Sequence, residues 1–175
     1  MEPEFRPDEI LRVLRQHEVQ FVLIGGLAAT AHGSPLLTRD VDITPSRSRD
    51  NLARLSAALT ELGARIRTSD VPEGIPFDHD AESLERVQVL NLVTDAGDLD
   101  LSFTPTGTAG FGDLNQEAIL MRPFGIPTEV ASLADVVRSK EAANRVKDQA
   151  ALPTLRRLLE AEQDDRRRER RRRSD

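Results

Sequence analysis

Apolar residues recur along the chain at two spacings, which predict alternating strands and helices. Spacings of three and four residues predict helices over 7–17, 27–32, 49–63, 133 to about 146, and from the turn that contains Pro153 onward. Short apolar or alternating runs predict strands over 21–26, 40–44, 86–93, 98–103, 117–122 and 125–130. Because helices cluster at the end, we expect an α/β (α+β) fold with a mixed β-sheet, flanking helices and a C-terminal helical pair.

The same pattern divides the chain. We expect a single domain over residues 1–161, with a helical C-terminal part over about 132–161. Residues 162–175 hold seven Arg and five acidic residues, and we expect them to form an Arg-rich, disordered tail. The segments 68–83 and 104–113 are rich in Gly, Pro and Asp or Thr, which is typical of loops.

Composition narrows the class of protein. No stretch approaches the roughly 20 apolar residues of a membrane span, and the N-terminus lacks the pattern of a secretory signal. The absence of Cys excludes disulfides and thiolate zinc sites. We therefore expect a soluble, cytoplasmic protein without membrane contact. The net charge of -6 excludes nucleic-acid binding by the overall field, so such binding needs a local basic surface or bound cations.

The sharpest chemical pattern is a glycine pair followed by two acids in a strand. Gly25 and Gly26 close an apolar run, and after thirteen intervening residues Asp40 and Asp42 follow in the sequence DVD. Side chains two apart on a strand share a face, so the two carboxylates repel each other unless a cation lies between them. Carboxylate oxygens suit Mg²⁺, which keeps room for phosphate oxygens in its shell. Glycine lets a phosphate approach the backbone.

A third carboxylate is available in the strand of sequence GDLDL. Asp98 and Asp100 point the same way, and we favour Asp100, which lies between two leucines, with Asp98 as the competing candidate. If this strand lies beside 40–44, three carboxylates can hold two Mg²⁺ ions. Two such ions activate a hydroxyl and hold a triphosphate in line.

Basic and polar residues supply candidate phosphate contacts. The chain has only two lysines, Lys140 and Lys147, and with Asn144 they share one face of the helix expected after Ser132. Asp148 lies at the edge of that face, whereas Arg145 falls off it. This strip suits a triphosphate or an RNA backbone, and the alternative is a solvated, salt-bridged helix surface. Three further candidates lie between the glycine turn and the strand, where loop polarity explains them equally well: Ser34, Thr38 and Arg39.

These motifs carry a resemblance. The pattern GG…TRDVD with a later LDL resembles the polymerase-β-type nucleotidyltransferase superfamily. The longer run GGLAATAHGSPLLTRDVDI and the stretch RSKEAANRVKD resemble the minimal bacterial nucleotidyltransferases related to AbiEii-type toxins, including mycobacterial MenT-like enzymes. The similarity covers most of residues 20–160. Some relatives carry an Arg where this chain has Leu36 and Leu37, and Arg39 is the candidate that compensates.

The resemblance implies a metal-dependent nucleotidyltransferase domain that moves a nucleoside monophosphate from an NTP to an acceptor hydroxyl and releases pyrophosphate. It implies that Asp40, Asp42 and Asp100 bind Mg²⁺ and that Asp100 helps to deprotonate the acceptor. Lys140 joins them as a catalytic candidate. It also implies nucleotide contacts by residues of the turn, the loop and the C-terminal strip, namely Gly25, Gly26, Ser34, Thr38, Arg39, Lys147 and Asp148.

Three functions compete for this pattern. The first is a toxin of a toxin–antitoxin pair that modifies the tRNA 3′ acceptor end and blocks translation, with a cognate antitoxin protein as partner. The second keeps the chemistry but transfers the nucleotide to a protein (AMPylation) or to a small molecule such as an aminoglycoside, whose positive charge suits the acidic body. The third is a non-catalytic binding module.

Overall fold

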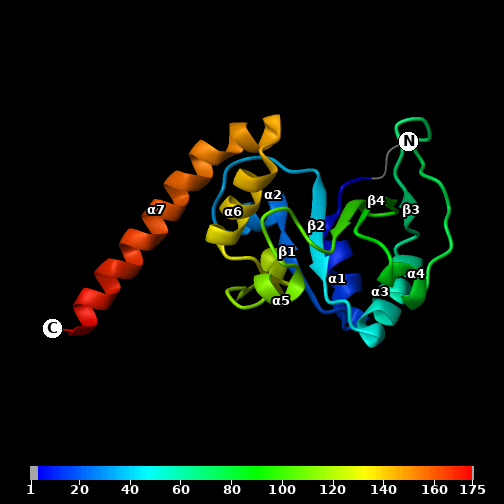
Figure 1. Ribbon diagram of the computed structural model, residues 1–175, viewed down its shortest axis with the longest axis horizontal. Helices are drawn as coiled ribbons and strands as arrows, with labels where there is room; N and C mark the ends of the chain where they lie inside the picture. Colours follow the sequence, from blue (N-terminus) through cyan, green and yellow to red (C-terminus); the bar gives the residue numbers. More distant parts are fainter. Residues whose placement is uncertain (1–3, 175) are drawn as a thin grey trace.

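The computed structural model describes residues 4–174, and within them one seven-stranded mixed sheet forms the centre of the molecule (Figure 1). The strand order is β3-β4-β5-β2-β1-β7-β6. Strand β2 pairs parallel with β5, and β1 pairs parallel with β7, while the other neighbours are antiparallel. The strands are β1 (Phe21–Ile24), β2 (Asp40–Pro45), β3 (Arg65–Ile66), β4 (Val89–Thr94), β5 (Gly97–Ser102), β6 (Ile119–Met121) and β7 (Thr128–Val130).

Helices flank this sheet. Helix α1 contacts α3 and the central strands β2 and β5, while α2 contacts α6, which packs against α7 (Figure 1). The helices are α1 (Pro7–Gln16), α2 (Gly25–Ala31), α3 (Arg49–Glu61), α4 (Ala81–Glu85), α5 (Phe111–Leu114), the 3₁₀ turn η1 (Pro123–Gly125), α6 (Leu133–Ala143) and α7 (Val146–Ser174). The expected mixed sheet, flanking helices and C-terminal helical pair are therefore confirmed.

Alternation in the two central strands separates the core from the acids. Val41 and Ile43 of β2 and Leu99 and Leu101 of β5 are fully buried. The aspartates between them lie on the opposite face, because successive side chains of a strand point to opposite sides. Burial of each leucine or isoleucine contributes about 1.5–3 kcal/mol, so the core holds these strands in register.

Several boundaries differ from the sequence pattern. The strand that was expected to run through 21–26 ends at Ile24, and the glycine pair opens α2 instead. Gly25 adopts φ +67°, a conformation that glycine takes without the steric cost of a Cβ atom. The short elements β3, α4 and α5 lie where no strand or helix was predicted, because two to five residues are too few to display a period.

The C-terminal helices also differ from expectation. The residues from 133 to 148 form two helices, because Asn144 ends α6 in the left-handed conformation with φ +50° and α7 begins at Val146. Pro153 therefore lies inside α7. The helix continues through Ser174, where a disordered tail was expected (Figure 1). Its i,i+4 pair between Glu162 and Arg166 is of the kind that supports an exposed helix.

Among the described residues, no helix has the length and apolar character that crossing a membrane requires.

Candidate active site

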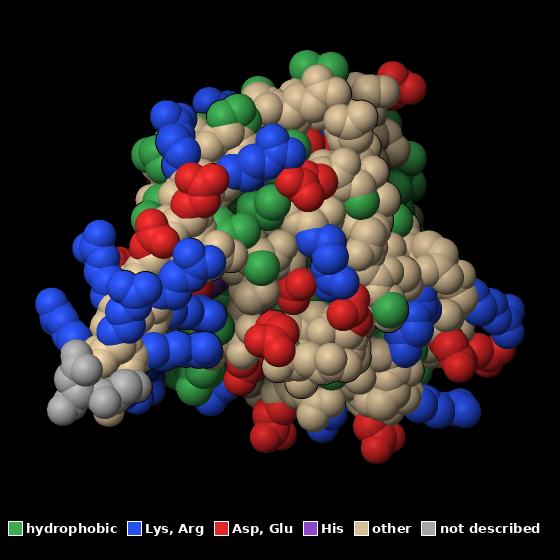
Figure 2. All heavy atoms as spheres, turned by 60° about the vertical axis from the view of Figure 1, so that its left-hand side comes forward, with side chains coloured by type: hydrophobic (Ala, Val, Ile, Leu, Met, Phe, Trp, Pro, Cys, Tyr) green, Lys and Arg blue, Asp and Glu red, His purple; other side chains and the backbone are tan. Residues whose placement is uncertain are grey.

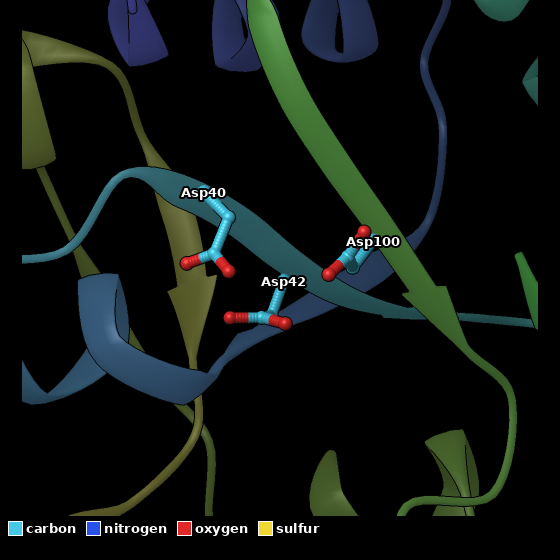
Figure 3. A group of neighbouring side chains, drawn as sticks. All are labelled: Asp40, Asp42 and Asp100. Carbon is cyan, nitrogen blue, oxygen red and sulfur yellow. The ribbon is translucent and has the colours of Figure 1, made fainter. Parts of the chain in front are cut away.

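Three carboxylates converge on the open face of the sheet. Strands β2 and β5 run parallel, with Asp42 opposite Asp100 and Asp40 opposite Asp98. Each of Asp40, Asp42 and Asp100 offers an oxygen within 4.8 Å of the other two. Figure 3 shows their side chains pointing into one space from two strands. This arrangement meets the expectation that acids from separate segments lie together.

Asp98 is not part of this group of three carboxylates, and it shares an arginine partner with Asp100. The Arg67 guanidinium, just after β3, lies 2.6 Å from an Asp98 oxygen and donates to both oxygens of Asp100 at 2.8 and 2.9 Å. Asp100 therefore belongs to the cluster, and its orientation is also held by the hydrogen bonds from Arg67. No pattern in the sequence marked Arg67, because it lies 33 residues from Asp100, between the predicted helix over 49–63 and the predicted loop over 68–83.

The electrostatics of the cluster favour a bound cation. Burial and the neighbouring charges of Asp40 and Asp100 raise the pKa of Asp42 from 3.8 to about 7, although Lys147 and Lys140 lower it in part. Burial also raises the pKa of Asp100, and Arg67 offsets part of that rise. Three carboxylates spaced this closely fit a hard divalent cation such as Mg²⁺, whose charge removes the repulsion between them.

The two glycines pack closely against strand β2, which carries the acids, and against the loop before it. A Cβ atom on Gly25 would lie 2.2 Å from Asp42 Oδ2, and one on Gly26 would lie 2.7 Å from Thr38 Oγ1. The same Thr38 hydroxyl donates to Asp40 Oδ1 at 2.8 Å. Both glycines are thus required by close approach, and Thr38 orients Asp40.

Asp42 and Asp100 line one wall of a cleft of about 750 Å³, and Asp40 lies close to them without being part of the lining. Helix α6 and the start of α7 form the facing wall, which presents Lys140, Arg145 and Lys147. Leu36 and Leu37, among the most exposed large apolar side chains of the described chain, also line the cleft. Figure 2 shows Lys and Arg side chains gathered near the free end of α7, while acidic and basic groups mix over the body. The cleft can hold a polyanion between metal-binding acids and fixed cations.

The basic wall is organised by a buried carboxylate. Asp148 is completely buried; one of its oxygens lies 3.2 Å from Lys140 Nζ and the other accepts from Arg145 Nε at 2.7 Å. Burial by itself raises the pKa of Asp148, but the hydrogen bonds from Arg145 and Lys140 outweigh it and hold that pKa below its usual range. The prediction that Lys140, Asn144 and Lys147 share one helical face is wrong, because the left-handed Asn144 breaks the helix.

The remaining sequence candidates divide by position. Ser34 is buried and lines the cleft, where its hydroxyl accepts from the Leu36 amide at 3.3 Å. Thr38 lines the cleft as well. Arg39 is exposed and lies outside the cleft lining, and its role as a replacement for an arginine at position 36 or 37 stays a prediction. Arg145, which helical spacing set aside, does line the cleft.

Comparison with known proteins yields a shared fold. At the level of sequence, no protein-family model and no curated protein matches this chain. The antibiotic-resistance factor ANT(2'')-Ia matches in its solution structure with TM-score 0.57 and 17% identity, over 89% of this chain and 83% of that chain. Its crystal structure with adenylyl-2''-tobramycin matches with TM-score 0.57 and 16% identity, over 90% and 89%.

A Thermotoga maritima protein, TM1012, matches with TM-score 0.54 and 18% identity, over 91% of this chain and 97% of that chain. Its assignment as a nucleotidyltransferase is itself provisional. These likenesses show that the chain has the mixed α/β fold found in nucleotidyltransferases.

The raised pKa of Asp42 generates a prediction about stability. In metal-free buffer, folded Asp42 holds its proton up to about pH 7, whereas the unfolded chain loses it near 3.8. The folded state therefore binds more protons between these values, and the free energy of unfolding falls as pH rises through this window. Asp42→Asn should remove that slope and stabilise the metal-free protein above pH 7 by on the order of 3 kcal/mol, as measured by urea unfolding.

Asp70→Asn, at an exposed carboxylate outside the cluster, is the matched control and should keep the wild-type slope. Mg²⁺ at 100 times the dissociation constant of the wild type should stabilise the wild type and the control by about 2.7 kcal/mol. The same Mg²⁺ concentration should not stabilise Asp42→Asn. Equal pH slopes in the wild type and in Asp42→Asn would contradict the electrostatic account.

The glycine turn generates a second prediction. Gly25→Ala should lower the free energy of unfolding by about 2–4 kcal/mol, because strain at positive φ adds to displacement of the Asp42 carboxylate. Gly33 also has positive φ, +98°, but a Cβ atom there meets open space, so Gly33→Ala should cost only about 1 kcal/mol. Only Gly25→Ala should weaken the Mg²⁺-dependent shift in melting temperature. Identical behaviour of the two variants in urea unfolding and thermal shift would refute the close-contact argument.

Proposed function

We propose that this protein is a nucleotidyltransferase that moves a nucleoside monophosphate from an NTP to an acceptor hydroxyl. The observation that carries the proposal is the cluster of Asp40, Asp42 and Asp100 at a cleft. Asp42 and Asp100 line that cleft, and its other wall presents Lys140 and Lys147. Acids that hold divalent ions opposite fixed cations suit the binding of a metal-chelated triphosphate. The shared fold with ANT(2'')-Ia supports this reaction class.

The residues take distinct parts in the proposed reaction. Asp40, Asp42 and Asp100 hold one or two Mg²⁺ ions, which when bound neutralise phosphate charge and lower the pKa of the acceptor hydroxyl. Asp100 accepts the proton from that hydroxyl, while the hydroxyl oxygen forms a bond to the α-phosphorus. The bond from the α-phosphorus to the bridging oxygen breaks, and pyrophosphate leaves with the electron pair.

The other cleft residues bind and orient the substrate in this proposal. Lys140 and Lys147 bind the phosphate oxygens, with Lys140 placed to stabilise the charge that develops on the leaving pyrophosphate. Gly25 and Gly26 let the phosphates approach the backbone, and Ser34 adds a hydroxyl to the same cleft. The exposed apolar side chains of Leu36 and Leu37 offer a surface for a nucleobase.

We propose an RNA terminal hydroxyl, such as the 3′ acceptor end of tRNA, as the acceptor. Helix α7 begins in the cleft wall and continues, away from the body, into a stretch with seven Arg between 166 and 173 (Figure 1). A polyanion whose end enters the cleft can thus contact cations along the helix. With the sequence resemblance to AbiEii- and MenT-like enzymes, this supports a toxin that blocks translation, with a cognate antitoxin expected from the resemblance alone.

A small-molecule acceptor is the second candidate, and one observation favours it. The fold is shared with an antibiotic-resistance factor that has been crystallised with adenylyl-2''-tobramycin. The acidic body of the present chain also suits a cationic drug. An aminoglycoside therefore belongs in the same assay as RNA.

The proposed activity predicts label transfer in a three-acceptor assay. With each α-³²P-labelled NTP and Mg²⁺, the wild type should label total tRNA in preference to protein or aminoglycoside. Asp42→Asn and Asp100→Asn should each lose about 100-fold or more of the rate, because each removes a metal-binding carboxylate.

Asp70→Asn should keep the wild-type rate, since that carboxylate lies outside the cleft. Label in the aminoglycoside or in protein, and not in RNA, would change the acceptor but leave the reaction class standing. Absence of label in every acceptor, together with no Mg²⁺- or NTP-dependent thermal shift, would favour a non-catalytic binding module.

A further inference from the structure

The junction between α6 and α7 holds an ionic arrangement that the roles above do not use. Asp148 is the third residue of α7, and one of its oxygens accepts from the backbone amide of Arg145 at 3.2 Å as well as from the Arg145 Nε at 2.7 Å. Its other oxygen accepts from Lys140 Nζ at 3.2 Å and from Arg145 Nη2 at 3.3 Å. One carboxylate therefore accepts four hydrogen bonds, one from Lys140 of α6 and three from Arg145, which lies between the two helices.

Such an arrangement is costly unless every lone pair is satisfied. A carboxylate with no exposed surface loses its hydration and is stabilised only by donors in good geometry. Here the backbone contact also forms half of a capping box at the start of α7, where a negative charge is favoured by the helix dipole. Asp148 thus fixes the helix start and both cationic side chains at once.

Arg145 keeps donors free on the cleft side. Its side chain is 60% exposed although Nε and Nη2 are engaged, and Nη1 has no hydrogen-bond partner among residues 4–174. Arg145 lines the cleft, and the negative charges of Asp42 and Asp40 act on it across the space. With Lys140 and Lys147, Arg145 gives the basic wall three positive side chains against the buried Asp148, while Asp135 of α6, which also lines the cleft, is paired with Arg138.

We propose that Arg145 binds the phosphate chain of the NTP directly and that Asp148 is a positioning residue that orients Arg145 and Lys140 toward it. This inference rests on the proposed nucleotidyl transfer and assigns a phosphate-binding side chain to it. A guanidinium pinned at one edge by a carboxylate presents its remaining N–H groups in a fixed direction, which suits two oxygens of neighbouring phosphates.

Inorganic triphosphate with Mg²⁺ is the probe, because it carries the phosphate chain without a base. Calorimetry on the full chain should show that Arg145→Gln weakens triphosphate binding by about tenfold, while binding of Mg²⁺ alone is unchanged because the carboxylate cluster is intact. Arg156→Gln is the matched control, since Arg156 also joins α7 to α6, through Glu141, but lies outside the cleft lining; it should bind like the wild type.

The positioning role has its own readout. Asp148→Asn should weaken triphosphate binding at least as much as Arg145→Gln, and Arg145→Lys should recover only part of the loss, because Lys keeps the charge but lacks Nε. If Asp148→Asn does not fold, the Arg145 variants still test the inference, because they change an exposed side chain. Unchanged triphosphate affinity in Arg145→Gln overturns the inference.

Failure of the inference and failure of the proposed function are separable. If the wild type transfers labelled nucleotide but Arg145→Gln binds triphosphate normally, the reaction stands and the role of Arg145 is wrong. If the wild type binds no triphosphate and transfers no label, both the inference and the proposed function are wrong.

Discussion

Repulsion among three carboxylates is the constraint on which the site depends. Parallel pairing of β2 with β5 sets Asp42 opposite Asp100 and leaves Asp40 one step away on the same face. The protein offsets this repulsion in part with its own cations, Arg67 behind Asp100 and the lysines across the cleft. Burial is the largest cause of the raised pKa of Asp42, and repulsion from Asp40 and Asp100 adds to it despite the lysines, so a further positive charge would stabilise the cluster.

Hydrophobic burial holds both walls of the cleft. On the acidic wall, the intervening Val41, Ile43, Leu99 and Leu101 lie in the core. On the basic wall, Val136 and Val137 of α6 and Leu155 of α7 lie in the same core, and the buried Asp148 adds an ion pair where the two helices meet. Removal of Asp148 would therefore disturb the junction of the basic wall while the apolar core stays in place.

The sequence was most informative where side-chain period and chemistry coincide. The acid strand, its leucine-flanked partner and the glycine pair could be predicted, because alternation determines the face on which Asp40, Asp42 and Asp100 lie. The start of α7 was not predicted, because residues 133 to 148 continue a helical spacing through Asn144, whose left-handed conformation ends α6. Arg67 was likewise out of reach, because its partners lie on a strand 33 residues away.

The two lysines have a practical consequence. Lys140 and Lys147 are the only lysines of the chain, and both line the cleft. The Lys140 side chain is 16% exposed, and Lys147 is exposed. An amine-directed reagent therefore has these two side chains, besides an α-amino group, as its targets on the whole molecule. The cleft can be labelled selectively without introducing any new residue, and a bound polyanion is directly readable as protection of those amines.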